Sequence, residues 1–260
     1  MGSGIIGLDQ WFESPAGRYL RAWECERMGQ AVADVFGYHA LQLGLPSLDT
    51  LAGNRMPHQW VACDQAVEPG GCALMADFAA LPFPENSLDL VTMPHTLELG
   101  TDPHAALREV ARVLVPDGRV VLTCLNPASL WGLRQRRDQL LQRLGVGELY
   151  LPAAGEFLAY RRLRDWLRLL DFEVESSQFG CYRSAARSEQ WLARMAWMDG
   201  VGGRWWPIFG AAYCIVAVKR VLGMRLISPA WKTRIGVATA PVSIAGRQAN
   251  SVANQGNDIE

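Results

Sequence analysis

Residues 75–127 read MADFAALPFPENSLDLVTMPHTLELGTDPHAALREVARVLVPDGRVVLTCLNP. The stretch contains two apolar, strand-like runs, Leu88–Met93 and Arg119–Leu125, on either side of an amphipathic segment. That segment has helix signals at both ends, because Asp102 is a good N-cap, Pro103 suits the first helical position and a Pro-Asp-Gly turn follows. Strand, helix and strand joined by short loops predict a βαβ unit with parallel strands and a right-handed crossover.

Several phrases in this stretch resemble one known family. They are DFAALPFPENSLDLV at 77–91, LREVARVL at 107–114 and PDG at 116–118. These phrases are similar to those of class I S-adenosylmethionine-dependent methyltransferases, and closest to the type 11 methyltransferase domain. HTLE at 95–98 and NPASLWG at 126–132 further resemble a proteobacterial branch of that superfamily.

The resemblance covers roughly residues 15–180 and implies a fold as well as a cofactor. The implied fold is α/β and Rossmann-like, a mostly parallel seven-stranded sheet with an antiparallel last strand and helices on both faces. The implied cofactor is S-adenosyl-L-methionine. We expect one methyltransferase-like domain over 1–227, with a helical insertion at about 186–206. Residues 228–260 are rich in Pro, Ser, Asn, Gln and Gly, which predicts a disordered tail.

Composition narrows the class of protein. The net charge of −1 gives no global attraction to nucleic acid or to an anionic membrane. The six cysteines are scattered without a C-x-x-C pair, which predicts small buried side chains in a reducing compartment and no metal site. Residues 1–10 lack the features of a signal peptide, and the longest apolar stretch, Ile208–Val218, is shorter than the ~20 residues that a spanning helix needs. These observations predict a cytoplasmic protein with no membrane partner.

The sequence differs from the family pattern at the end of the first predicted strand, residues 39–44, and in the turn after it. The family places an acidic residue there, followed by a turn of the form E/D-x-G-x-G-x-G. Here the sequence QLGLPS keeps only the first glycine, Gly44, and has Gln42 in place of the acid. Both residues are candidates for cofactor binding. Gln42 can exchange hydrogen bonds with a ligand, but it cannot neutralise an ammonium group as a carboxylate would.

The next two predicted strands each end in an aspartate. The resemblance implies that Asp64 accepts hydrogen bonds from the ribose hydroxyls, while Asp77 accepts from the adenine amino group and the Phe78 N–H meets a ring nitrogen. The alternative is that both aspartates serve turns, which favour this residue; for Asp77 that turn is 78–81.

The fourth and fifth strands add the remaining candidates, because their carboxyl ends face the ligand crevice of this fold. Pro94 is a candidate for cofactor binding. His95 is a candidate general base, with a satisfied structural histidine as the alternative. Asn126 and Trp131 are candidates for substrate binding, since an aromatic ring beside arginines can hold a planar or anionic acceptor. The arginines after Trp131 fit a solvated helix face equally well.

A leading helix over residues 15–35 is predicted to begin at a Ser14 cap. Tyr19, Trp23 and Glu24 on this helix could border the site, although aromatic residues packing a helix onto the sheet is the simpler interpretation.

Three functions are compatible with these patterns. The first hypothesis is an S-adenosylmethionine-dependent methyltransferase that acts on a small-molecule acceptor. The second is a non-catalytic relative whose cofactor site is weakened or lost, supported by the eroded glycine turn. Methylation of RNA or DNA is disfavoured, and it depends only on the arginine-rich stretches 134–143 and 161–168. A nicotinamide dehydrogenase is disfavoured because no G-x-G-x-x-G follows any predicted strand. The oligomeric state is not predicted.

Overall fold

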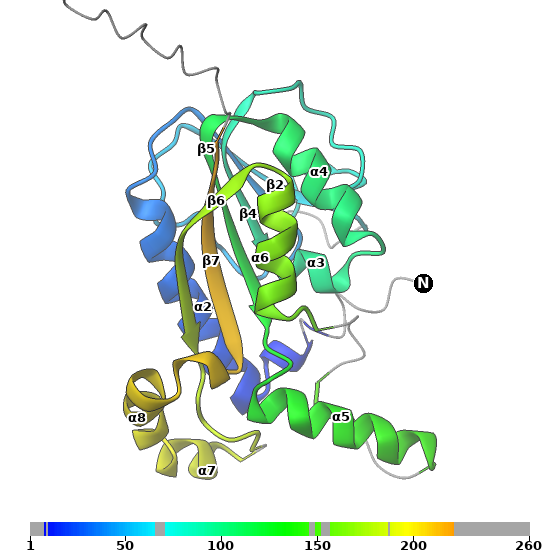
Figure 1. Ribbon diagram of the computed structural model, residues 1–260, viewed down its shortest axis with the longest axis vertical. Helices are drawn as coiled ribbons and strands as arrows, with labels where there is room; N and C mark the ends of the chain where they lie inside the picture. The colour runs from blue at the N-terminus through cyan, green and yellow to red at the C-terminus, as the bar shows by residue number, and fades with distance from the viewer. Residues whose placement is uncertain are drawn as a thin grey trace, which may run out of the picture. The chain divides into compact units, whose positions relative to one another are not determined.

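A seven-stranded sheet with the order β3-β2-β1-β4-β5-β7-β6 forms the centre of the computed structural model (Figure 1). The structure describes residues 8–220 except 9, 66–70, 146–148, 152–156 and 187. The strands are β1 (His39–Leu43), β2 (His58–Cys63), β3 (Leu74–Met75), β4 (Leu88–Pro94), β5 (Leu114–Leu125), β6 (Phe172–Gly180) and β7 (Ala212–Lys219). The helices are α2 (Pro15–Ala33), α3 (Thr96–Leu99), α4 (Pro103–Val113), α5 (Leu130–Arg143), α6 (Tyr160–Leu169), α7 (Glu189–Arg194), α8 (Trp197–Trp205) and the 3₁₀ turn η1 (Pro207–Phe209).

The strand directions confirm the predicted fold class. Strands β1 to β5 pair in parallel, whereas β7 runs antiparallel to both β5 and β6. The predicted βαβ unit corresponds to β4, α4 and β5. As predicted, Asp102 caps α4, accepting a hydrogen bond from the backbone N–H of Ala105 at 2.9 Å.

Strand β5 begins earlier than the sequence predicted. Leu114 already pairs with Leu88, and the register then shifts so that Arg119 pairs with Leu90. The expected turn around Asp117 therefore lies inside the strand as an irregularity, with Asp117 in a left-handed conformation (φ 62°). A turn signal and a strand bulge use the same residue types, so the sequence pattern could not separate them.

Helices cover both faces of the sheet and define two cores. On one face α2 packs against the sheet through Leu20, Met28 and Val32. On the other face α4 and α6 contribute Val110 and Leu167, together with neighbours on the same helix sides. Figure 1 shows α4 and α6 on the near side of the strands and α2 along the other side. None of the described helices is long and apolar enough to cross a membrane.

The connection from β1 to β2, residues 44–57, contains no helix. Its Leu45, Leu48 and Leu51 are buried in the core beneath α2 instead. Asn54 fixes the end of the connection by donating from its side-chain amide to the carbonyl oxygens at the C-terminal end of α2, at 2.8 and 3.0 Å. The loop and α2 together supply the apolar cover that a crossover helix gives elsewhere in the sheet.

Other elements differ from expectation in length. The third strand is only two residues long, and the predicted inserted helix is the pair α7 and α8. The described residues belong to one compact unit that spans Met1–Gly223. The predicted disordered tail, 228–260, lies outside the described residues.

Candidate active site

The carboxyl ends of the parallel strands carry the candidate residues, beginning with the turn after β1. Gly44 has a left-handed backbone (φ 78°), and its N–H donates to the carbonyl oxygen of Ala62 at 2.8 Å. The ring of Phe78 and the hydroxyl of Thr96 border this glycine, since an added Cβ would lie 3.8 and 3.6 Å from them. Pro94 is buried beside them, and its carbonyl oxygen accepts from the Thr96 hydroxyl at 3.3 Å.

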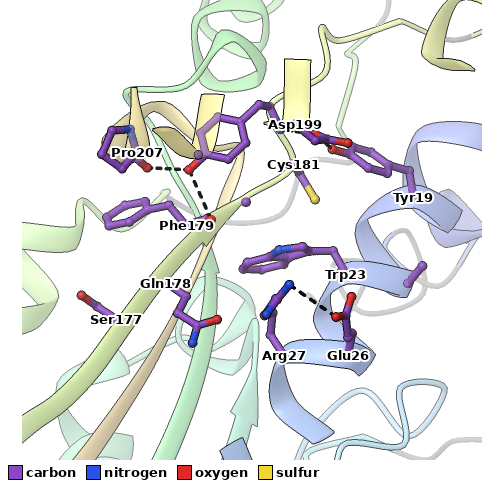
Figure 2. A pocket seen from close by; sticks show the side chains of 14 residues that line it. Tyr19, Trp23, Glu26, Arg27, Ser177, Gln178, Phe179, Cys181, Asp199 and Pro207 are labelled. Carbon is purple, nitrogen blue, oxygen red and sulfur yellow. Dashed lines mark hydrogen bonds and ion pairs between the residues drawn. The ribbon is translucent and has the colours of Figure 1, made fainter. Parts of the chain in front are cut away.

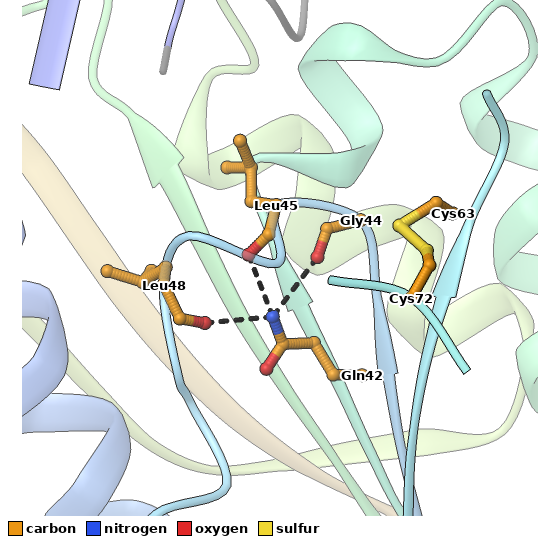
Figure 3. The surroundings of a disulfide bond; sticks show 6 residues. All are labelled: Gln42, Gly44, Leu45, Leu48, Cys63 and Cys72. Carbon is orange, nitrogen blue, oxygen red and sulfur yellow. Dashed lines mark hydrogen bonds between the residues drawn. A yellow bond between two sulfur atoms is a disulfide. The ribbon is translucent and has the colours of Figure 1, made fainter. Parts of the chain in front are cut away.

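Gln42 is fully engaged by its own loop (Figure 3). Its amide nitrogen donates to the carbonyl oxygens of Gly44, Leu45 and Leu48 at 3.1, 2.9 and 2.8 Å. Its amide oxygen accepts from both the backbone N–H and the hydroxyl of Thr50, at 3.1 and 2.7 Å. The N–H of Thr50 fixes which end of the amide is the oxygen, so the donor must face the three carbonyl groups.

This network explains why the family's acid is missing from the position. Three carbonyl oxygens point at the position that one oxygen of a carboxylate would occupy. A buried carboxylate oxygen there would face three other acceptors without a donor between them, which is unfavourable in the protein interior. The predicted contact of Gln42 with a cofactor would need a free hydrogen-bonding atom on this side chain. The donors and the acceptor of the Gln42 amide already have partners inside the protein. Gln42 shapes the turn that ends at Gly44.

Asp64 and Asp77 extend from neighbouring strands and are both exposed. Partial burial raises the pKa of Asp64, and the negative charge of Asp77 adds to the increase. Asp77 also accepts a hydrogen bond from the N–H of Ala79 at 2.8 Å, which is the turn-capping role considered as its alternative. The ring of Phe78, between the aspartate and this turn, is buried.

A disulfide joins Cys63, at the end of β2, to Cys72, just before β3 (Figure 3). The prediction that all six cysteines are unpaired is therefore wrong for these two. The two cysteines are nine positions apart, at the two ends of the connection between β2 and β3. This spacing matches no close cysteine motif in the sequence. The bridge ties down the connection that holds Asp64.

His95 lies in the interior between two carboxylates. Its Nε2 is 2.7 Å from Glu24 Oε1 and its Nδ1 is 2.7 Å from Glu98 Oε2, and all three side chains are at most 3% exposed. The second oxygen of Glu98 accepts from the backbone N–H of Leu125 at 2.8 Å. The triad therefore ties α2 to the ends of β4 and β5.

The triad changes the expected role of His95. Burial opposes the imidazolium charge, but Glu24 and Glu98 outweigh burial and raise the pKa of His95 to about 10. Burial also raises the pKa of the Glu98 carboxyl, against the influence of His95. An imidazolium that keeps its proton at neutral pH and is closed to solvent cannot serve as a general base. The structure thus places His95 as a buried, ion-paired residue between two carboxylates, which favours the structural alternative over the general base.

Asn126 and Trp131, the expected substrate residues, are both buried. The side-chain amide of Asn126 donates to the carbonyl oxygens of Ile208 and Gly210 at 2.7 and 2.9 Å. The indole N–H of Trp131 donates to the carbonyl oxygen of Arg183 at 2.8 Å. The Asn126 amide therefore holds the residues between α8 and β7 at the end of β5, and the Trp131 indole holds α5 to the residues that follow β6.

A cavity of about 600 Å³ lies between α2 and the end of β6 (Figure 2). Its walls combine aromatic, charged and polar side chains, among them Tyr19, Trp23, Glu26, Arg27, Phe179 and Asp199. Trp23 lies directly against Gly180, where an added Cβ would be only 2.1 Å from the indole. Gly180 is therefore required for the present position of the Trp23 ring.

Asp199 fixes the far wall of this cavity. It accepts a hydrogen bond from the hydroxyl of Tyr19 and forms an ion pair with Arg183, whose Nε is 2.9 Å from Oδ2. The guanidinium of Arg183 in turn stacks over the Tyr19 ring, 4.3 Å from its centre. Burial, reinforced by Asp199, raises the pKa of Tyr19, so this phenol stays protonated.

Some cavity residues could have been found from the sequence and others could not. Tyr19, Trp23 and Arg27 recur every four residues on a predicted helix, which places them on one face. Only the first two were considered, and Arg27 was missed. Asp199 comes from a segment 180 positions away from Tyr19, and no local pattern links them. Within the described ranges, no group of three or more His, Cys, Asp or Glu residues is placed to hold a metal ion.

Comparison with known sequences identifies the family. The family described as "Methyltransferase domain" matches residues 45–122. The Uncharacterized protein YafS of Escherichia coli is 31% identical over 171 residues, which are 65% of this chain and 67% of YafS. The ubiquinone/menaquinone biosynthesis C-methyltransferase UbiE of Cronobacter sakazakii is 35% identical over 100 residues, 37% of this chain and 38% of UbiE. The alignment thus spans well under half of the length of UbiE.

Comparison with solved structures gives the same fold. A chain from the complex of the Haloferax volcanii Trm112 methyltransferase activator with a methyltransferase superposes with a TM-score of 0.57 at 15% identity. The superposition covers 85% of this chain and 99% of that one. The strand order of the sheet, the match to the methyltransferase family and the length of the alignment with YafS all indicate the same family. The chain belongs to the class I S-adenosylmethionine-dependent methyltransferases.

Proposed function

We propose that the protein transfers a methyl group from S-adenosylmethionine to a small-molecule acceptor. The observation that carries the proposal is the pair of exposed carboxylates, Asp64 and Asp77, at the ends of adjacent strands beside the left-handed Gly44. Carboxylates are the acceptors that ribose hydroxyls and an adenine amino group require. When bound, the cofactor supplies a methyl group on a sulfonium that an acceptor nucleophile can displace.

The two ends of the cofactor fit this chain differently. The nucleoside end fits Asp64 and Asp77, which are both exposed, and the backbone at Phe78 next to them. The amino-acid end has no matching carboxylate, because Gln42 holds its own loop and Leu45 is buried in the core. We therefore expect the nucleoside to supply most of the binding free energy.

The size and chemistry of the cavity beside α2 support a small acceptor. Its volume of about 600 Å³ is within the range of small-molecule sites. Trp23 offers an aromatic face, and Arg27 offers a cation next to it. A planar or anionic molecule would use both features.

Binding can be tested by titration calorimetry with S-adenosylmethionine and with its demethylated product. We expect Asp64→Asn and Asp77→Asn each to weaken binding by about 1–3 kcal/mol, because the amide has one uncharged acceptor oxygen in place of the two charged oxygens of the carboxylate. Asp165→Asn is the matched control, because Asp165 is an exposed carboxylate on α6 away from these strand ends. Equal affinities for all three variants would place the nucleoside elsewhere.

Acceptor class needs a separate measurement. Methyl transfer from radiolabelled cofactor into a cell extract should label the small-molecule fraction rather than protein or nucleic acid. Trp23→Ala should lower this transfer while leaving cofactor affinity intact, because Trp23 lines the cavity and not the strand ends. Label in the macromolecular fraction alone would contradict the small-molecule part of the proposal.

A second function, a non-catalytic methyltransferase fold, is favoured by one observation. All polar atoms of Gln42 are satisfied inside the protein, and the loop around it needs no ligand to be complete. This function predicts no calorimetric signal with either cofactor form at concentrations that fill an ordinary cofactor site.

A further inference from the structure

Large apolar side chains are exposed mainly on two segments of this chain. Among the described residues, fifteen such side chains are exposed, and eleven of them belong to 130–144 or 191–209. They are Leu130, Leu133, Leu140, Leu141, Leu144, Trp191, Trp197, Trp205, Trp206, Ile208 and Phe209. We call these eleven residues the tryptophan–leucine surface. A concentration of this kind marks an interaction site, whereas scattered single residues would not.

The first segment is an amphipathic helix with its apolar stripe turned outward. At about 100° per residue, the five exposed leucines of 130–144 fall in one stripe about 100° wide. The opposite side of α5, with Trp131, Gln135 and Asp138, is buried against the rest of the protein. The exposed stripe is therefore not needed for packing within the described part of the chain.

The second segment supplies tryptophans at the same end of the sheet. Figure 1 shows α5, α7 and α8 together at the end of the molecule toward which β5 and β6 run. A hollow of about 370 Å³ lies between the two segments and is lined by Leu130, Leu133, Trp197, Trp206 and Phe209. The tryptophan–leucine surface is thus continuous across α5 and α8.

Charge on this surface is positive, unlike the net charge of the chain. Segments 130–144 and 188–209 contain six arginines and three acidic residues. The three acids already have partners, since Asp138, Asp199 and Glu189 each form an ion pair with an arginine. Arg136, Arg143 and Arg204 are exposed and form no ion pair within the described residues.

We propose that the tryptophan–leucine surface docks onto an anionic phospholipid bilayer. Tryptophan is the side chain most suited to the boundary between acyl chains and headgroups, and arginine can extend from an apolar stripe to lipid phosphates. The outward leucine stripe of α5 would lie in the plane of the interface. The proposal revises the expectation of no membrane partner, which came from the net charge of −1 and from the lack of a signal peptide and of a spanning apolar stretch in the sequence. It does not depend on methyl transfer.

Vesicle flotation of the full chain tests the proposal. The wild type should float with vesicles of phosphatidylglycerol mixed with phosphatidylcholine, and far less with phosphatidylcholine alone. The bound fraction should fall as salt is raised, because exposed charges are screened. The Arg136→Gln/Arg143→Gln double variant should bind about 25-fold more weakly, at about fivefold for each arginine. The Trp205→Ser/Trp206→Ser double variant should lose most of the bound fraction.

Two matched controls separate this surface from general effects. Phe36→Ser removes a large side chain that is 79% exposed but lies outside the surface, and should float like the wild type. Arg108→Gln/Arg161→Gln removes two exposed arginines of α4 and α6 and should also have no effect. Circular dichroism checks that each variant is folded. Absence of flotation, or equal flotation of all variants, would overturn the proposal. Self-association that the double tryptophan variant abolishes, without flotation, would assign the surface to protein contact and would also overturn it.

Discussion

The side-chain amide of Gln42 donates a hydrogen bond of 2.9 Å to the carbonyl oxygen of Leu45, the residue that follows the one glycine retained from the family's turn. This bond and its neighbours give the loop between β1 and β2 an ordered structure around the Gln42 amide.

The first prediction concerns this amide. Gln42→Glu should lower the free energy of unfolding by about 3 kcal/mol at pH 7, because a carboxylate would face three carbonyl oxygens without a donor. Urea unfolding measures the loss, which should shrink at low pH as the carboxyl gains a proton to donate. Gln59→Glu is the control, since Gln59 makes similar contacts from an exposed position. A loss as small as that of the control would mean that the loop does not depend on the Gln42 donor.

The second prediction concerns the pH dependence of stability through His95. Its pKa is raised from 6.5 to about 10 in the folded state. The stabilisation is therefore fully present below about pH 6.5 and is lost as pH rises toward 10, at up to ~1.4 kcal/mol per pH unit. Urea unfolding across this range should show the decline in the wild type.

Variants isolate the contribution of the triad. His95→Gln should remove the decline, and Glu24→Gln should weaken it by removing one of the two carboxylates. His104→Gln, at an exposed histidine of α4, should keep it. Parallel pH profiles for the wild type and His95→Gln would show that the imidazole does not hold an extra proton.

The third prediction concerns the disulfide. Cys72→Ser should lower the free energy of unfolding by about 2–3 kcal/mol, the chain-entropy value for a loop of roughly ten residues. Unfolding with and without a reductant provides the measurement, and the reductant should have no effect on the variant. Cys25→Ser, at an exposed unpaired cysteine, should behave like the wild type. Insensitivity of the wild type to the reductant would contradict a stabilising bridge.

The fourth prediction uses two glycines at the cavity end of the molecule. Gly180→Ala should cost about 1–3 kcal/mol and displace the Trp23 ring, because the new methyl group would overlap the indole. Gly200→Ala in α8 meets no atom within 4 Å and should instead stabilise the protein by up to ~1 kcal/mol. Unfolding measurements on both variants, together with tryptophan fluorescence, distinguish the two effects. Equal behaviour of the two variants would mean that Trp23 moves aside without cost.

Local signals in the sequence predicted much of the fold. Caps such as Ser14 and Asp102 and the apolar runs around them located α2, α4 and the strands that follow, because these features act within a few residues. The family phrases supplied the sheet order, which no local pattern contains. The length of β3 could not be predicted, since two residues of pairing leave almost no periodic signal.

The candidate site was predicted less well, for a physical reason. The ion pair of His95 involves Glu24, which is far away in sequence. The hydrogen bonds of Gln42 go to carbonyl groups of the following loop, so they depend on the path of that loop. Residue type and strand position indicate where a side chain begins but not which partners it finds. Net charge says little about a local surface, because an average over 260 residues hides the three exposed arginines, Arg136, Arg143 and Arg204, that form no ion pair in the part of the chain that the structure describes.

The ion pair between Glu24 and His95 also bears on where this domain starts. The family match begins at residue 45, after both α2 and β1. A fragment cut to that boundary would leave an imidazolium in the interior with only one counter-ion and would uncover the apolar loop that α2 shelters. The smallest piece of the chain able to fold as a unit therefore includes the leading helix, and expression of a trimmed version should yield aggregates rather than a folded domain.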